Sequence, residues 1–312
     1  MNPIPPSPYL EVGIDLSKDR LDVAMSGKLL SVSNDRKGIA SLLDNIASLS
    51  EPCRLSCEAT GPYSRLLIAC CLRRKIPVSI VNPRAVRNLA RASGRLAKTD
   101  GLDAMLIARY SKAFNPPLLD DSWFTRTKLS QLLQRIDFLI SSRARCKASL
   151  DSYDDPRILA DIRREILALD KRIEAYQTQI DSEITANVQL DQRRNLMLRL
   201  KGVGPATSTA LIVTMPELGS LNRKEVAALC GLAPINRDSG RMSGKRMIQA
   251  GRSRPRRALY MAALSASKHH PGLSQYYRQL RDKGKPAKVA LTAIARKLVI
   301  MLNTSLKAAQ QT

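Results

Sequence analysis

The first third of the chain alternates strand-like and helix-like patterns of apolar residues. Apolar positions at a period of two predict strands over residues 9–17, 20–26, 28–33, 53–59 and 77–81. Apolar spacings of three and four predict helices over 38–49, 63–74, 82–90 and 100–113. Three strands followed by alternating helices and strands is the element order of an RNase H-like domain, so an α/β fold is expected here.

The middle of the chain predicts two long helices. Residues 129–147 and 156–181 carry apolar side chains three and four positions apart with many charges between them, and Asp154-Asp155-Pro156 is typical of a turn and a helix start. One narrow apolar stripe needs a partner helix, so a helical hairpin or coiled-coil arm is one interpretation and an ordinary bundle core is the other. The stripe comprises Ile158, Ile162, Ile166, Leu169, Ile173 and Ile180.

The last third is predicted to be mainly helical with glycine-rich interruptions. Together these patterns predict an α/β domain over residues 1–120, a helical arm or linker over 121–195 and a mainly helical domain over 196–312. A length of 312 residues suits two or three domains.

Charge is the most informative feature of the composition. The formal net charge is +24, and residues 201–312 hold 20 Lys and Arg against four Asp and Glu. Such an excess predicts a polyanionic partner. Aromatic residues make up only 4% of the chain, so phosphate contacts rather than base stacking on a broad aromatic surface are expected to supply the affinity.

Other features of the composition exclude several classes of protein. A run of about 18 apolar residues, as a membrane span needs, is not found, and the first residues do not form a signal-peptide pattern. The six cysteines show no paired CxxC spacing, which favours reduced thiols over disulfides or a zinc site. A cytosolic protein that does not bind membranes is expected.

Four carboxylates form the first candidate site. Asp15 and Glu58 each come late in a predicted strand, while Asp100 and Asp103 lie three residues apart on one face of a predicted helix. In an RNase H-like topology these elements converge, and four acids would repel one another unless divalent cations such as Mg²⁺ or Mn²⁺ neutralised them. The alternative is that each acid only caps a helix or ends a turn, with Asp19 and Asp22 as competing acids nearby.

A basic, glycine-rich stretch forms the second candidate site. Residues 237–288 hold 14 Lys and Arg against two acids, and Ser239-Gly240 and Ser243-Gly244 offer hydroxyls within it. A serine can attack a phosphodiester when cations screen the phosphate, although Ser-Gly is also common in turns. The adjacent pair His269 and His270 suits either phosphate contacts or a helix end.

A third candidate is the glycine-containing turn in residues 200–212, LKGVGPATSTALI. Two helices joined by Gly-x-Gly can hold a DNA phosphate through loop amides and a helix N-terminus, as in a helix-hairpin-helix. A packing turn between two core helices is the equal alternative.

These motifs together resemble the DEDD transposases of the insertion-sequence 110 (IS-110/IS-1111) family. The resemblance covers nearly the whole chain and rests on five segments: VGIDLSKDRLDVA (12–24), CEATGPYS (57–64), VNPRAVRNLARASGRLAKTDGLDAMLIARY (81–110), LKGVGPATSTALI (200–212) and LCGLAPINRDSGRMSGKRMIQAGRSRPRRALYMAAL (229–264). It implies a RuvC-like N-terminal domain, a helical arm and a C-terminal transposase domain.

The resemblance also assigns roles to residues of this chain. It places the family's metal-binding acidic tetrad on Asp15, Glu58, Asp100 and Asp103 and the catalytic serine on Ser239. It implies a bacterial cytosolic recombinase that forms a covalent serine–DNA intermediate, pairs donor and target DNA through a structured non-coding bridge RNA, and assembles from dimers into a tetramer. Phosphate contacts are expected from Arg237, Arg241, Lys245, Arg246 and Arg256.

Two alternatives use only part of these features. A RuvC-like nuclease or Holliday junction resolvase would need the four acids but would use water in place of Ser239. A non-enzymatic nucleic-acid-binding protein would need only the positive charge.

Overall fold

The computed structural model describes residues 8–59, 61–93, 100–235, 247–248 and 250–310, and within them the side chains of 100–102, 235 and 247 are left out. The chain divides into two compact units, Met1–Thr125 and Arg126–Thr312. The second unit contains both the predicted arm and the C-terminal helices. The division into three domains expected from the sequence remains a prediction.

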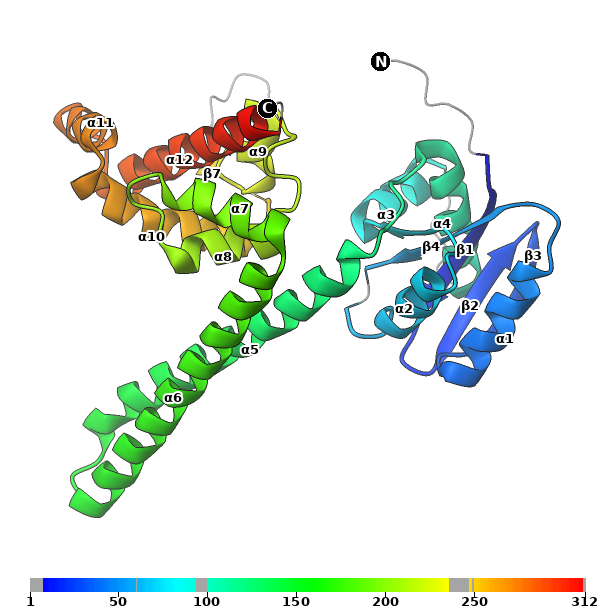
Figure 1. Cartoon of the computed structure of the whole chain (residues 1–312), viewed down its shortest axis with the longest axis horizontal. Helices are drawn as coiled ribbons and strands as arrows, with labels where there is room; N and C mark the ends of the chain where they lie inside the picture. The colour runs from blue at the N-terminus through cyan, green and yellow to red at the C-terminus, as the bar shows by residue number, and fades with distance from the viewer. Residues whose placement is uncertain (1–7, 60, 94–99, 236–246, 249, 311–312) are drawn as a thin grey trace. The chain divides into compact units, whose positions relative to one another are not determined.

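A five-stranded sheet organises the first unit (Figure 1). The strand order is β3-β2-β1-β4-β5: β2 is antiparallel to both β1 and β3, β4 is parallel to β1, and β5 is parallel to β4. This mixed sheet is compatible with an RNase H-like domain. The strands are β1 (Leu10–Leu16), β2 (Arg20–Met25), β3 (Lys28–Ser33), β4 (Cys53–Glu58) and β5 (Val78–Val81).

Helices cover both faces of this sheet. Val12 and Ile14 of β1 are fully buried in a core shared with α1 and α2. The intervening Gly13 lies against α4 instead, because successive residues of a strand point to opposite faces. The helices of this unit are α1 (Arg36–Ala47), α2 (Arg65–Arg73), α3 (Pro83–Ala92) and α4 (Asp100–Phe114).

The α1 and α3 helices begin where polar caps are available. Asp35 accepts a hydrogen bond from the Gly38 amide at the start of α1, and Asn82 accepts one from the Arg84 amide at the start of α3. All of the strands and helices predicted for the first third are present, with boundaries shifted by a few residues.

Two long antiparallel helices form the predicted arm, α5 (Ser122–Ser149) and α6 (Pro156–Ala186), joined by the short 3₁₀ helix η1 (Leu150–Ser152). Lys128, near the start of α5, pairs with Glu183, near the end of α6, and Arg143, near the end of α5, pairs with Asp170, nearer the start of α6. The two helices therefore run antiparallel. The predicted stripe is buried from Ile166 onwards. At the start of α6 the prediction was wrong: Ile158 is 42% exposed, because it lies beside the turn, where α5 ends.

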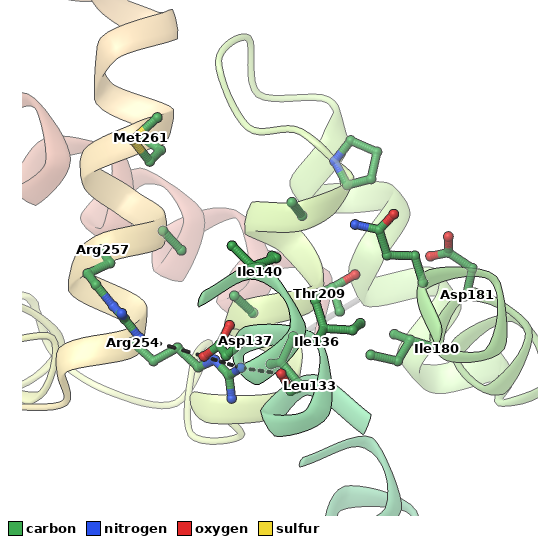
Figure 2. Close-up of a pocket in the computed structure, with 15 residues that line it drawn as sticks. Leu133, Ile136, Asp137, Ile140, Ile180, Asp181, Thr209, Arg254, Arg257 and Met261 are labelled. Carbon is green, nitrogen blue, oxygen red and sulfur yellow. Dashed lines mark hydrogen bonds and ion pairs between the residues drawn. The ribbon is translucent and has the colours of Figure 1, made fainter. Parts of the chain in front are cut away.

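Two arginines of α10 hold the arm to the rest of its unit. Arg254 donates to the Leu133 carbonyl oxygen at 2.6 Å and pairs with Asp137 at 2.5 Å, both on α5 (Figure 2). Arg257 reaches the same Asp137 carboxylate at 3.6 Å. The base of the arm is thus fixed by charge as well as by its apolar stripe.

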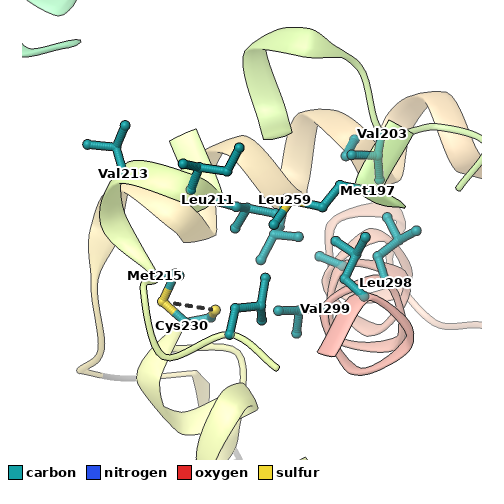
Figure 3. Close-up of a cluster of buried hydrophobic side chains, with 14 of the residues drawn as sticks. Met197, Val203, Leu211, Val213, Met215, Cys230, Leu259, Leu298 and Val299 are labelled. Carbon is teal, nitrogen blue, oxygen red and sulfur yellow. Dashed lines mark hydrogen bonds between the residues drawn. The ribbon is translucent and has the colours of Figure 1, made fainter. Parts of the chain in front are cut away.

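In the described part of the second unit, the arm is followed by six helices and one small two-stranded sheet. Leu211 of α8, Leu259 of α10 and Leu298 of α12 meet in its buried core (Figure 3). The elements are α7 (Val188–Leu198), α8 (Pro205–Thr214), α9 (Arg223–Leu229), β6 (Pro234–Ile235), β7 (Met247–Ile248), α10 (Ser253–His269), α11 (Pro271–Asp282) and α12 (Ala287–Ala309).

The last helix, α12, is long and apolar enough to cross a membrane by length and composition, alone among the helices within the described ranges. Its buried face, which includes Ile294 and Leu298, packs in the protein core, and Arg296 and Lys297 lie on its other side. This pattern is that of a core helix.

Candidate functional site

The α4 face of the sheet brings three pairs of residues into line along β1 and β4. In the parallel register Glu11 lies beside Arg54 and Gly13 beside Ser56. Ile14 and Cys57 are the last aligned pair, so Asp15 and Glu58 come next, on the same face as Gly13 and Ser56. Along this face the Glu11–Arg54 pair lies at one end, Gly13 and Ser56 lie in the middle, and Asp15 and Glu58 lie at the other end.

At one end of this face a buried ion pair fixes the C-terminal end of α4. Arg54 is 1% exposed and donates to both carboxylate oxygens of Glu11, at 3.0 and 2.6 Å. It also donates to the carbonyl oxygens of Ser111 (2.9 Å) and Pro116 (3.2 Å) and to the Asn115 side chain (2.5 Å). The arginine satisfies acceptors at the end of α4 that would otherwise be buried without partners.

In the middle of this face α4 contacts the strand backbone directly. A Cβ atom on Gly13 would overlap the Ala104 carbonyl oxygen and lie 2.5 Å from the Ala108 amide nitrogen. Only glycine permits so close an approach between helix and strand.

At the other end the N-terminal turns of α4 lie toward the two strand acids. Because Ser111 and Asn115 lie at the Glu11 end and Ala104 lies over Gly13, α4 runs back along β1 toward Asp15. Asp103 directly precedes Ala104 and is half-buried. Asp100 is the first residue of α4, and its side chain lies outside the described residues. The fold therefore directs the elements carrying all four predicted acids to one end of the sheet.

A fifth acid faces Asp15 from the neighbouring strand. Asp22 of β2 is directly opposite Asp15 in the antiparallel register. Two like charges in that position are unfavourable. Arg20 binds the Asp22 carboxylate through Nε at 3.1 Å and through its terminal nitrogen at 3.0 Å. Asp19, the other competing acid, lies in the turn between β1 and β2.

The chemistry of these acids suits a hard divalent cation, since carboxylate oxygens are its preferred ligands. Among the described side chains, which do not include that of Asp100, no three carboxylate, imidazole or thiol groups converge on one point. Metal binding by the tetrad thus remains a prediction that the arrangement of β1, β4 and α4 supports.

Ser239 lies outside the described residues, as do Arg237, Arg241, Lys245 and Arg246. These residues belong to residues 236–246, called the serine segment below. The strands on either side of it are described and pair with each other: Pro234 aligns with Ile248, and Ile235 with Met247. Both ends of the segment that contains the predicted nucleophile therefore lie side by side in the second unit.

Two glycines at the base of this segment pack directly together. A Cβ on Gly251 would overlap the backbone of Gly231, and both residues have positive φ, +68° and +62°. A Cβ on Gly231 would in turn overlap the guanidinium group of Arg256. Arg256 donates to the Ala250 carbonyl oxygen and so stabilises the contact between the two glycines. Its expected contact with phosphate remains a prediction.

A second arginine links α10 to the loop after α8. Arg252 donates to both carboxylate oxygens of Glu217, at 2.8 and 2.7 Å, and to the Thr214 carbonyl oxygen at 2.7 Å. Burial acts to raise the pKa of Glu217, but the Arg252 hydrogen bonds and charge outweigh it, so the pKa of this carboxyl lies below its ordinary value. Glu217 is thus held as a carboxylate beside the start of α10.

The Gly-x-Gly turn serves packing at its first glycine and is open at its second. A Cβ on Gly202 would lie 2.6 Å from the Ala266 side chain of α10, whereas nothing lies within 4 Å of one on Gly204. Gly204 caps the N-terminus of α8. The packing interpretation is confirmed for Gly202, and the phosphate-binding interpretation stays a prediction.

His270 lies where one helix ends and the next begins. It accepts a hydrogen bond from the Leu273 amide at the start of α11, so it ends α10 and caps α11. The six cysteines are free thiols in the structure, and their redox state remains a prediction.

Sequence reasoning missed the residues that position α4. A glycine inside an apolar strand, such as Gly13, signals close backbone approach and could have been found. Glu11 and Arg54 are charged residues inside apolar strands, and that pattern could have pointed to an internal ion pair.

Comparison with known proteins agrees with this architecture. Residues 12–153 match the profile of the DEDD transposases of the IS110 group, described as a transposase. Residues 194–278 match the profile described as transposase of the IS116/IS110/IS902 family.

Individual relatives extend the similarity over most of the chain. A pilin gene-inverting protein of Moraxella bovis is 30% identical over 306 residues, which cover 92% of each chain, and one of Moraxella lacunata matches to the same extent. An uncharacterised 44.8 kDa protein of insertion element IS116 from Streptomyces clavuligerus is 30% identical over 148 residues, 47% of this chain and 36% of that protein. The chain belongs to the IS110 family of transposases and is an enzyme that acts on DNA.

Proposed function

We propose that this transposase is an RNA-guided DNA recombinase that cuts and rejoins strands through a covalent phosphoserine at Ser239. The observation that carries the proposal is the α4 face of the first unit, where β1, β4 and α4 direct Asp15, Glu58 and Asp103 toward one end of the sheet. The serine segment, whose ends pair in β6 and β7, supplies the other half of the chemistry.

The four acids are proposed as ligands for divalent cations. Asp15, Glu58, Asp100 and Asp103 would hold Mg²⁺ or Mn²⁺, and the ions would supply charge neutralisation at the scissile phosphate. Arg54 and Gly13 set the position of α4 and thereby of its two acids. Arg20 pairs with Asp22, which partly balances the charge of this fifth acid beside the tetrad.

Ser239 is proposed as the nucleophile. Its Oγ attacks the phosphorus atom of one phosphodiester and loses its proton, a serine–phosphate bond forms, and the bond to one sugar oxygen breaks. That oxygen leaves with a proton as a hydroxyl, and a hydroxyl from the second duplex later reverses the step to join new strands. Arg237, Arg241, Lys245 and Arg246 are proposed to bind the flanking phosphates.

The partners are proposed from the charge and the family. A guide RNA paired with donor and target DNA is a large polyanion, which suits a net charge of +24, and base pairing would carry the sequence specificity. Dimers that pair into a tetramer would let the acids of one subunit act with Ser239 of another. The named action of the Moraxella relatives, inversion of a pilin gene, also requires exchange of DNA strands.

A strand-exchange assay on paired serine variants tests this proposal. Purified protein with its co-purifying RNA and two labelled duplexes is compared for wild type, Ser239→Ala and Ser243→Ala. We expect Ser239→Ala to lose exchange by at least about 10³-fold while binding DNA normally, since it lacks the nucleophile. Ser243→Ala, which changes a neighbouring Ser-Gly hydroxyl, should retain exchange.

The opposite outcomes decide between the alternatives. Retained exchange in Ser239→Ala would contradict the assignment of the nucleophile. Cleavage of branched DNA that needs the acids but not the serine would instead support the RuvC-like junction resolvase, which uses water.

A further inference from the structure

A pocket of about 600 Å³ lies beside the ends of the serine segment, on the second unit. Pro234 of β6 and Ile248 of β7 line it on one side, and α12 lines it on the other. Tyr276 of α11 also contributes. The pocket is built entirely from described residues, and the proposed function does not use it.

The residues of α12 that line the pocket form one face of that helix, separate from the face that is buried in the core. Val289, Thr292, Ala293, Arg296 and Ile300 recur at spacings of three, one, three and four residues, so they share one face. The opposite face, with Ile294 and Leu298, is buried in the core. Val289 is 53% exposed and Ile248 is 36% exposed, which leaves apolar surface open to a ligand.

Three cations rim this apolar surface. Lys288, Arg296 and Lys297 line the pocket, and its lining contains no carboxylate. The Lys297 ammonium lies 3.7 Å from the centre of the Tyr276 ring, so a cation–π contact positions this charge over the aromatic side chain. An apolar floor with an aromatic ring and a cationic rim complements a base attached to a phosphate.

The groove between the arm and α8 and α10 provides a contrast. It has a similar volume, about 610 Å³, and it is also largely apolar (Figure 2). Its cations Arg254 and Arg257 are paired with Asp137, and Asp181 adds a second carboxylate. Its charges are thus balanced internally, so it lacks the excess of positive charge that lines the pocket on α12.

We propose that the α12 pocket binds one unstacked nucleotide of the nucleic-acid substrate. The base would lie on Val289, Ala293 and Ile248, and its phosphates would face the three cations. The inference rests on the proposed function in taking nucleic acid as the ligand. Since Pro234 and Ile248 adjoin the serine segment, this nucleotide would belong to the strand that is presented for cutting.

The test measures binding of two short single-stranded DNAs to the full-length protein. One carries 2-aminopurine at its centre, and the other has an abasic site there. Ala293→Leu fills the pocket, and Ala309→Leu places the same side chain at the exposed end of α12 as a control. Lys297→Glu is matched with Lys307→Glu, which makes the same change in net charge on the same helix outside the pocket.

Wild type and Ala309→Leu should bind the 2-aminopurine strand about tenfold more tightly than the abasic strand and should quench its fluorescence. Ala293→Leu should lose this difference. Lys297→Glu should weaken binding of both strands more than Lys307→Glu does, because its charge lies at the phosphates. Circular dichroism of each variant establishes that the fold is intact, and the lysine pair provides the test if Ala293→Leu does not fold.

Equal affinity of wild type for the two strands would overturn the proposal, as would a preserved difference in folded Ala293→Leu. Equal weakening by Lys297→Glu and Lys307→Glu would also contradict it. If instead a glutamate-rich peptide bound wild type but not Ala293→Leu, with no difference between the DNAs, the pocket would be assigned to a protein partner. Because the readout is binding, its failure is separate from any failure of Ser239 in strand exchange.

Discussion

At the residue scale, Gly13 shows how one missing side chain positions a candidate site. Its hydrogen lets the Ala104 carbonyl and Ala108 amide of α4 lie against β1. Asp103 is the residue next to Ala104, so its distance from Asp15 depends on this contact. A larger side chain would push the helix, and its acids, away from the strand.

Gly13→Ala therefore tests this packing. We expect a loss of about 3 kcal/mol in the free energy of unfolding of the first unit, at the upper end of typical overpacking costs, because the clash is with backbone. Gly204→Ala is the control, since its Cβ would have open space and its φ of −100° suits alanine. Denaturant unfolding measures both, and equal stability of the two variants would refute the role of Gly13.

The buried pair of Arg54 and Glu11 makes a second prediction at this scale. Arg54→Met leaves the Glu11 carboxylate and the carbonyl groups of Ser111 and Pro116 buried without the arginine, so we expect destabilisation of about 3–5 kcal/mol. Arg164→Met removes the exposed pair with Asp161 and should cost under about 1 kcal/mol. Thermal unfolding of both variants checks the contrast, and a small effect at Arg54 would show that the pair does not hold α4.

Residue types alone could predict the acids but not their arrangement. Glu58 is unusual because it ends a half-apolar strand, whereas an Asp at the end of a strand, such as Asp15, is more often a turn or cap residue. Charged residues inside apolar strands can indicate an internal ion pair, but which two residues form it depends on the register of β1 and β4, and residue types do not give this register. The Ser239 assignment came from the resemblance to a family rather than from its Ser-Gly context, which is ordinary turn chemistry.

At the element scale, periodicity identified the strands and helices because their apolar faces are continuous. Residues 10–16 and 53–58 alternate cleanly, and α6 keeps its three- and four-residue spacing to the end. Periodicity within α6 could not show where its partner α5 ends. It therefore places Ile158 in the apolar stripe, although α5 does not cover that residue. The pairings of Lys128 with Glu183 and Arg143 with Asp170 supply that register.

The stripe of the arm makes an element-scale prediction. Ile173 is 5% exposed and Leu167 is 61% exposed, although both lie on α6. Ile173→Ala should lower the free energy of unfolding by about 2–4 kcal/mol, since it opens a cavity. Leu167→Ala should change it by less than about 0.5 kcal/mol. Equal effects in chemical denaturation would mean that the two helices do not pack as described.

The link between Arg252 and Glu217 makes stability depend on pH. Because the pKa of Glu217 is lowered below its ordinary 4.5, its contribution is present above pH 4.5 and is lost as the pH falls through the folded value. Glu217→Gln should thus have a lower Tm than wild type at neutral pH, and the gap should close in acid. Tm profiles of both proteins test this, and a gap that stays constant with pH would contradict it.

At the scale of the whole molecule, chemistry and charge are divided between two units. The acids lie on the first unit, whereas the last third, within the second unit, carries 20 of the 51 Lys and Arg with only four acids. Charge could be read from composition, and the polyanionic partner that it predicted agrees with an enzyme that acts on DNA. Composition could not indicate which basic residues contact which DNA strand, because that depends on the geometry of the complex with DNA.

The measurement that tests the central claim most directly is identification of the covalent product. Wild-type protein with its RNA is incubated with Mg²⁺ and a nicked DNA substrate that prevents religation, then digested and analysed by mass spectrometry. We expect a nucleotide attached to the peptide that contains Ser239, and we expect this adduct to be absent in Asp15→Asn. An adduct on another residue, or cleaved DNA with no adduct, would contradict it.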